Sequence, residues 1–160
     1  VFPNLVTVPV TDGKIDFYNH SGTVDLIADL AGYYSPSGGS VFTSLGPTRV
    51  LDTRNGTGGY TSPVGAGQSI SLQVAGMAGV PAGVSAVVLN VTAVSPTAAS
   101  YVTVYPDGSP RPVASDLNFT AGEVIPNLVI VPVTDGKVDF YNHSGTVDLV
   151  ADLAGYFTSG

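Results

Sequence analysis

Two histidines, His20 and His143, are the side chains of this sequence best suited to proton transfer near neutral pH. Each is followed directly by a serine in an "NHSG" stretch. Nucleophilic catalysis needs a serine, a histidine and an orienting acid that converge in space, and two neighbours in one turn do not provide that geometry. The G-x-S-x-G pattern of hydrolase nucleophiles is absent. We therefore interpret both histidines as turn residues and predict no catalytic residues.

Twelve acidic residues could supply paired carboxylates for glycosidic chemistry, but they are spread one or two per turn or strand. Three precede glycine, which turn formation explains: Asp12, Asp107 and Asp135. Asp148 and Asp152 share one face of an expected strand, and Asp139 could lie near them. Three carboxylates can bind Ca²⁺, but the spacing is not that of an EF-hand loop. We interpret these acids as solvated and predict no metal and no cofactor.

The stretch "LDTR" places Asp52 and Arg54 two residues apart, on one face of an extended strand. Only five residues of the chain are basic, so we expect Arg54 to meet a carboxylate. Asp52 and Asp152 are the candidates. The sequence predicts a structural ion pair among Asp52, Arg54 and Asp152 that fixes strand register.

The stretch "YVTVY" alternates, which directs Val102 and Val104 to the core and the other side chains outward. Tyrosine can stack on the apolar face of a sugar ring while its hydroxyl stays in water. The outward residues therefore form a candidate carbohydrate platform: Tyr101, Thr103, Tyr105 and, on a neighbouring strand, Tyr141. Tyrosine is also common in sheets for packing reasons alone.

The net charge is −7, and the basic residues form no dense patch. Nucleic acid is an unsuitable partner because phosphate backbones require clustered cations. No apolar run approaches the roughly 20 residues of a membrane span, so we expect no membrane insertion. The chain has no cysteine, which excludes disulfides and thiolate chemistry.

With 20 glycines and 12 prolines, the composition is that of short strands joined by tight turns. About eight strand patterns occur between residues 41 and 157. They predict an all-β fold, most simply an antiparallel β-sandwich, with a closed β-barrel as the alternative. Within the pattern, Asp135-Gly136 of "TDGK" is expected to form a type I′ hairpin turn.

One long segment occurs twice. Residues 1–34 match residues 124–157 without a gap, at an offset of 123 residues and with five differences. A repeat this long is a whole domain produced by tandem duplication. We predict that 1–34 is the C-terminal part of a preceding repeat, 35–40 a linker, 41–157 one complete repeat and 158–160 a tail.

The partial copy is expected to hold three strands, "NLVTVPV", "KIDFYN" and "TVDLIADLAGYY". Such a meander would leave one apolar face bare. Either it replaces 124–157 in a permuted domain, or 41–157 folds alone and 1–34 pairs with another chain by strand complementation. We favour the second outcome, because local hairpins would keep 124–157 beside its own sheet.

The ordered strings "RVLDTR", "VVLNVTAVSPTAASYVTVYP", "SDLNF", "NLVIVPV" and "DLAGYF" resemble a tandem β-repeat module of secreted or cell-surface actinobacterial proteins. The resemblance covers 41–157, with 1–34 as a partial copy. It implies an extracellular, non-catalytic domain with no established activity. Similar sequences often carry cysteine where this chain has Asp107 and Asp139, which implies that these two positions lie close together.

The sequence thus favours a structural repeat that serves as a spacer or adhesive stalk. Its expected partners are neighbouring repeats or other copies of itself. The alternative is a carbohydrate-binding module with polysaccharide as its partner.

Overall fold

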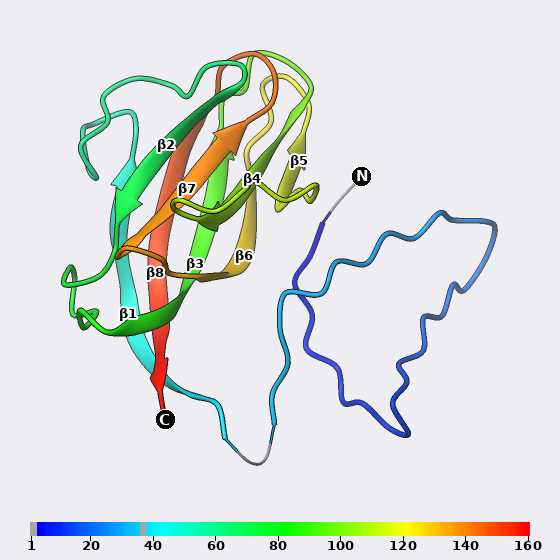
Figure 1. Ribbon diagram of the computed structural model, residues 1–160. Coiled ribbons are helices and arrows are strands. Elements are labelled where there is room, and N and C mark those ends of the chain that lie inside the picture. Colours follow the sequence, from blue (N-terminus) through cyan, green and yellow to red (C-terminus); the bar gives the residue numbers. More distant parts are fainter. Residues whose placement is uncertain (1–2, 36–37) are drawn as a thin grey trace.

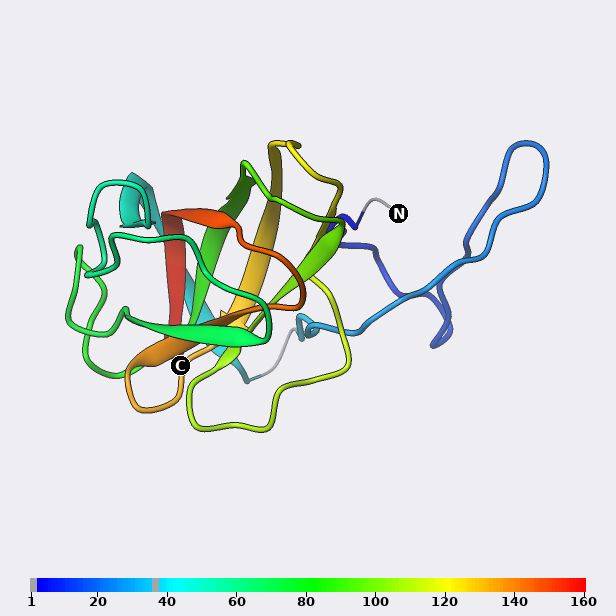
Figure 2. The same ribbon diagram turned by 90° about the horizontal axis from the view of Figure 1, so that it is seen from above.

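The structure is a computed structural model that describes residues 3–35 and 38–160. It contains eight strands, all antiparallel to their neighbours: β1 (Ser40–Asp52), β2 (Gln68–Gln73), β3 (Val84–Val94), β4 (Ser100–Pro106), β5 (Leu117–Phe119), β6 (Ile125–Pro132), β7 (Lys137–Asn142) and β8 (Asp148–Ser159). They form two four-stranded sheets, in the orders β1-β8-β3-β6 and β2-β7-β4-β5. The sheets face each other as two layers (Figures 1 and 2). The prediction of an antiparallel β-sandwich is confirmed, and the alternative of a closed barrel is wrong.

The core lies between the two layers. It is built from alternate residues of the strands, such as Val87, Leu89 and Val91 of β3, while their neighbours in sequence face outward. Phe140 of β7 is the largest fully buried side chain, and Leu149 and Leu153 of β8, in the other sheet, belong to the same buried cluster. This one core extends over all eight strands, so the segment from β1 to β8 forms a complete folding unit.

The three strands of the repeated segment are not neighbours. β6 and β8 lie in the first sheet on either side of β3, and β7 lies in the second sheet between β2 and β4. The turn between β6 and β7 has the expected conformation, with positive φ at Asp135 (52°) and Gly136 (77°). The turn leads from one sheet to the other. Pairing across the expected hairpin is therefore limited to the isolated bridge between Thr134 and Lys137. The repeated strands depend on partners from β1 to β4.

Residues 3–35, here called the N-terminal arm, form no strand in the structure (Figures 1 and 2). The prediction of three strands in 1–34 is therefore wrong for its described part. Its one ladder contact is the Thr11–Lys14 bridge, around a turn with positive φ at Asp12 and Gly13. The physical reason lies in the topology, because β1 to β4 already pair with the strands of residues 124–157. Residues 124–157, and not the arm, occupy the positions of β6, β7 and β8.

The repeat starts and ends at one pole of the sandwich. Ser40, at the start of β1, pairs with Ser159, at the end of β8, and the backbone N–H of Gly160 donates to the carbonyl of Gly39 at 3.2 Å. Strand pairing therefore extends slightly beyond residues 41 and 157, from Ser40 to Ser159. The last linker residue and most of the tail belong to the sheet, while residues 36 and 37 lie outside the described part. No helix in the described part of the chain is long and apolar enough to cross a membrane.

Candidate functional site

The first candidate site is an aromatic cluster on the outer side of the second sheet. Tyr101 of β4 stacks on the His143 imidazole, with ring centroids 4.6 Å apart and planes 14° from parallel. Tyr141 of β7 lies beside both rings and carries the Arg111 guanidinium 4.1 Å above its ring centre. The β4–β7 pairing sets this arrangement, and the His143 amide donates to the Tyr101 carbonyl at 3.1 Å. Arg111 was not among the candidate residues, and His143 was interpreted as a turn residue and not as a member of this cluster.

Thr103 and Tyr105 do not join this cluster. Both face away from the core, as the alternation predicts, but Thr103 is fully buried and Tyr105 is only 8% exposed. The segment after β4 folds back over Thr103, whose hydroxyl donates to the Ala114 carbonyl at 2.6 Å, while the Tyr105 hydroxyl lies 3.1 Å from the Ser69 hydroxyl of β2. Asp116 of the same segment accepts from the Val104 amide at 2.7 Å. The expected exposure of Thr103 and Tyr105 is therefore wrong, and the platform is reduced to Tyr101 and Tyr141, both partly exposed.

Two carboxylates, Asp107 and Asp139, meet at the end of β4. The hydroxyl of Ser71 donates to Asp139 and lies 3.5 Å from Asp107, and Tyr105 pairs with Asp139 across the β4–β7 ladder. The proximity that the family resemblance implied is confirmed. Burial raises the pKa of Asp139, the hydrogen bond from Ser71 opposes this, and the nearby Asp107 raises the pKa further. The pair thus holds Asp139 in an environment that disfavours its charged form.

The predicted ion pair is present, with one change of partner. Asp52 is buried and accepts from Arg54 Nε at 2.8 Å and from Arg54 Nη2 at 2.7 Å. Asp152 instead pairs with Arg49, at 3.0 Å, because Arg49 stands directly opposite Asp152 in the β1–β8 register. Arg49 also reaches Asp52 at 3.4 Å and links the two pairs. The hydrogen bonds from Arg54, with the nearby charges, lower the pKa of Asp52 to about 2.

The rest of "LDTR" is equally structural. Thr53 is fully buried, its hydroxyl donates to Asp148 at 2.7 Å, and the same oxygen accepts from the Leu149 amide at 3.0 Å. The acids considered for calcium are therefore apart, with Asp148 and Asp152 engaged on the first sheet and Asp139 on the second. Within residues 3–35 and 38–160, no group of three or more His, Cys, Asp or Glu is placed to hold a metal ion.

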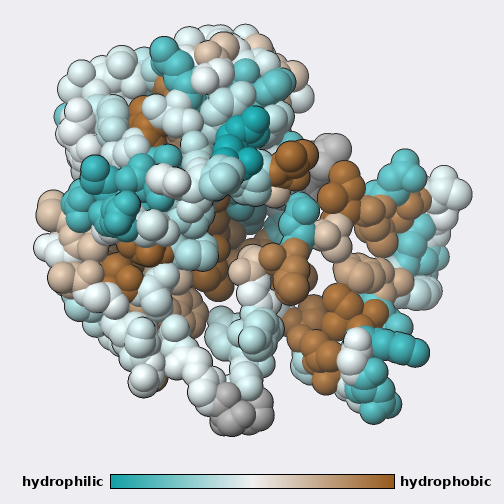
Figure 3. All heavy atoms as spheres, viewed as in Figure 1, coloured by the Kyte–Doolittle hydropathy of each residue, from teal (hydrophilic) through white to brown (hydrophobic). Residues whose placement is uncertain are grey.

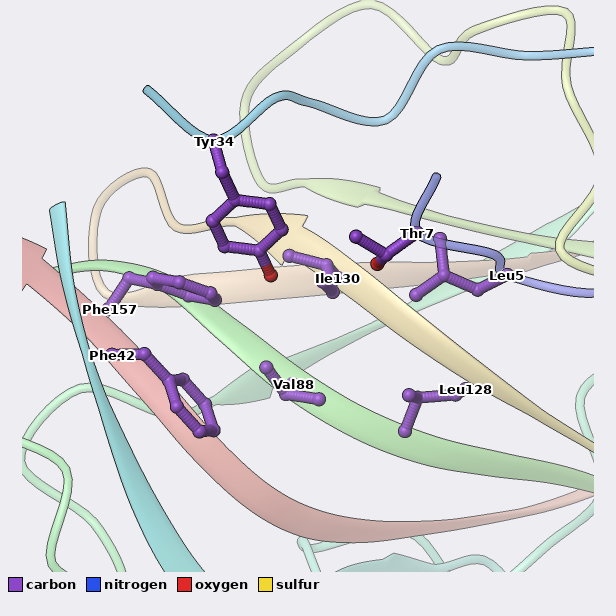
Figure 4. A pocket seen from close by; sticks show the side chains of 8 residues that line it. All are labelled: Leu5, Thr7, Tyr34, Phe42, Val88, Leu128, Ile130 and Phe157. Carbon is purple, nitrogen blue, oxygen red and sulfur yellow. The ribbon is translucent and has the colours of Figure 1, made fainter. Parts of the chain in front are cut away.

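A second candidate site is an apolar area on the outer face of the first sheet, here called the junction patch. Its five members are Phe42 of β1, Val88 of β3, Leu128 and Ile130 of β6, and Phe157 of β8. Together with the N-terminal arm they line a cavity of about 220 Å³ (Figure 4). Hydrophobic side chains gather where the arm approaches the sandwich and along the arm itself (Figure 3). The sequence analysis did not identify this patch, because its residues come from four strands whose order only the fold reveals.

No protein-family model matches this sequence, and no curated protein or solved structure shows significant similarity to it. The function is therefore inferred from the repeat and from the geometry of these sites.

Proposed function

We propose that this chain is part of a secreted or cell-surface protein built from tandem repeats, in which each repeat is a non-catalytic structural unit that acts as a spacer or adhesive stalk. The observation that carries the proposal is the near-identical copy at an offset of 123 residues, which reproduces the sequence of β6 and β7 and most of β8. Duplication of a complete folding unit lengthens the protein by one folded domain and does not require that domain to have a new activity.

The polar side chains support a structural role. Asp52, Thr53 and Asn142 are buried. Thr53 bonds to Asp148 and Asn142 to the Val64 carbonyl, both in distant parts of the chain, while Asp52 bonds to the nearby Arg54. In the described part of the chain, no buried side-chain nitrogen or oxygen lacks a hydrogen-bond partner. Polar groups with such partners specify one packing arrangement. They are the groups that a rigid repeated unit requires.

The position of the repeat's ends supports close spacing along the protein. Because β1 starts beside the end of β8, the polypeptide enters and leaves each repeat at the same pole. The distance between successive repeats then depends on the short linker and not on the length of the sandwich.

Carbohydrate binding is the second candidate function, favoured by the part of Tyr101 and Tyr141 that remains exposed. A stacking platform needs a free ring face. One face of Tyr101 is covered by His143, and one face of Tyr141 is covered by Arg111. These internal contacts favour the structural role over the platform.

The test is a binding and activity screen with the full chain. The chain is incubated with insoluble cellulose, chitin and peptidoglycan, and with substrates for glycosidases, esterases and peptidases. We expect the protein to stay in the supernatant and turnover to remain at background. Retention that disappears in the double variant Tyr101→Ala, Tyr141→Ala would replace the proposal with carbohydrate binding. Turnover that disappears in His143→Ala would replace it with catalysis.

A further inference from the structure

The junction patch exposes large apolar side chains on a sheet face that a single repeat leaves uncovered. Phe42 is 47% exposed and Leu128 is 42% exposed, although both lie on regular strands. The rings of Phe42 and Phe157 pack against each other with centroids 5.1 Å apart. Gly155 makes this possible, because a Cβ at that position would lie 2.5 Å from the Phe42 ring. The patch is thus a formed apolar surface without a charged side chain.

The N-terminal arm identifies what this surface contacts. Three arm residues, Leu5, Thr7 and Tyr34, line the same cavity as the patch, and Tyr34 lies over Phe157 with ring centroids 6.4 Å apart (Figure 4). At the offset of 123 residues, these three positions are equivalent to Leu128, Ile130 and Phe157. The cavity therefore brings together the same three positions from two successive repeats.

The linker keeps two successive patches within reach of each other. From Tyr34, which is equivalent to Phe157, only six residue steps lead to Ser40 at the start of β1. A chain spans at most about 3.6 Å per residue, so these two points lie no more than about 22 Å apart. Since Phe42 and Phe157 lie at the same pole as Ser40 and Ser159, the patches of two joined repeats lie on either side of one short linker.

From these observations we infer that the junction patch packs against the same patch of the adjacent repeat in the chain, and this inference rests on the proposed tandem-repeat function. The contact joins equivalent surfaces, as in a two-fold dimer interface. An uncharged interface suits two acidic partners, since the chain carries a net charge of −7. Each patch serves one contact, so the repeats associate in pairs along the array.

The test uses a chain of two complete repeats, made of residues 40–157 joined through residues 35–39 to residues 40–160. Each repeat contains the whole core and all eight strands, except that β8 of the first repeat lacks its last two residues, so we expect each repeat to fold on its own. Leu128→Cys is introduced into both repeats, which is informative because the chain has no other cysteine. We expect mild oxidation to form one disulfide within the chain. The matched control is Val113→Cys in both repeats, at a fully exposed residue outside the patch, which should stay reduced.

A second measurement does not depend on cysteine chemistry. Phe42→Glu in both repeats places two like charges in the proposed interface, and small-angle X-ray scattering should show a larger radius of gyration than for the parent chain. Val113→Glu in both repeats is the control and should leave the radius unchanged. Circular dichroism checks that each variant retains its fold. If Phe42→Glu unfolds the protein, the disulfide measurement alone tests the inference.

The inference is overturned if Leu128→Cys stays reduced under the conditions of the control. It is also overturned if the disulfide forms only between two chains, because the patch then binds a repeat of another molecule. These outcomes leave the proposed function intact, since the polysaccharide and substrate screens are independent of how repeats pack.

Discussion

Arg54 donates two side-chain hydrogen bonds to the buried carboxylate of Asp52, at 2.8 and 2.7 Å. Arg49 approaches the same carboxylate at 3.4 Å while it pairs with Asp152. One buried anion thus organises the end of β1 and the loop that follows it. Asp52 pairs with two arginines, whereas Asp152 pairs with one. We therefore expect the charge of Asp52 to contribute more to stability than the charge of Asp152.

Asp52→Asn is expected to lower the free energy of unfolding by about 1–2 kcal/mol at pH 7, in the lower range for bonds to charged groups, because both guanidinium groups are half exposed. The pKa of Asp52 falls from its ordinary 3.8 to about 2, so its contribution is complete above pH 3.8 and is lost as the pH falls toward 2. Urea denaturation of both proteins at several pH values measures this. The more exposed Asp152→Asn serves as control, with an expected loss below about 1 kcal/mol. Equal losses at pH 7 and pH 2 would contradict the assignment.

Asp139→Asn is expected to stabilise the protein near neutral pH by about 0.5–1 kcal/mol, a usual gain from removing an unfavourable charge. Burial and Asp107 raise the pKa of Asp139, so the folded state binds a proton more tightly than the unfolded state. The stability of the parent protein therefore decreases as the pH rises from the ordinary pKa through the raised one. The melting temperature against pH measures the effect, which should vanish at acidic pH. Asp16→Asn, at the equivalent arm position, should change nothing.

Phe140→Ala is expected to lower the free energy of unfolding by about 3–5 kcal/mol, because it leaves a cavity in the centre of the core. Phe17 occupies the equivalent position of the arm but is 59% exposed, whereas Phe140 is fully buried. Phe17→Ala should therefore change stability by less than about 0.5 kcal/mol. Denaturation curves of both variants provide the comparison. A comparable loss in Phe17→Ala would mean that the arm is packed in solution.

Asn142→Ala is expected to destabilise the fold by about 2–4 kcal/mol, because buried polar groups would lose their partners. The Asn142 amide donates to the carbonyls of Val64 and Gly145, both at 3.0 Å, and its Oδ1 accepts from Ser100 at 3.0 Å. Asn19→Ala is the matched change in the arm and should have no measurable effect on the transition. Thermal unfolding followed by circular dichroism distinguishes the two. If both variants melt like the parent chain, the bonds of Asn142 do not limit stability.

Much of the fold could be predicted from residue patterns. Alternating apolar residues separated by glycine and proline indicated an eight-stranded sandwich. Scarce charges indicated that Arg54 would meet a carboxylate, Asp52 or Asp152, and the partner is Asp52. The candidate platform was predicted less well, since Tyr105 and Thr103 alternate correctly and are nevertheless covered. Thr103 is covered by the segment around Ala114, and the Tyr105 hydroxyl meets Ser69 of β2, and both contacts lie between segments that no local pattern brings together.

The duplicated segment separates what the sequence alone determines from what the tertiary structure decides. Both copies form the same Asp-Gly turn with positive φ, and in both an asparagine side chain donates to the glycine carbonyl three residues later, Asn19 to Gly22 and Asn142 to Gly145. These interactions span a few residues, so their loop-closure cost is small and each copy forms them without help. Strands differ, because their hydrogen bonds and apolar faces need partners from elsewhere in the chain. Residues 124–157 find those partners in β1 to β4 and become β6, β7 and β8, while the arm, with nearly the same sequence but no such partners, stays open.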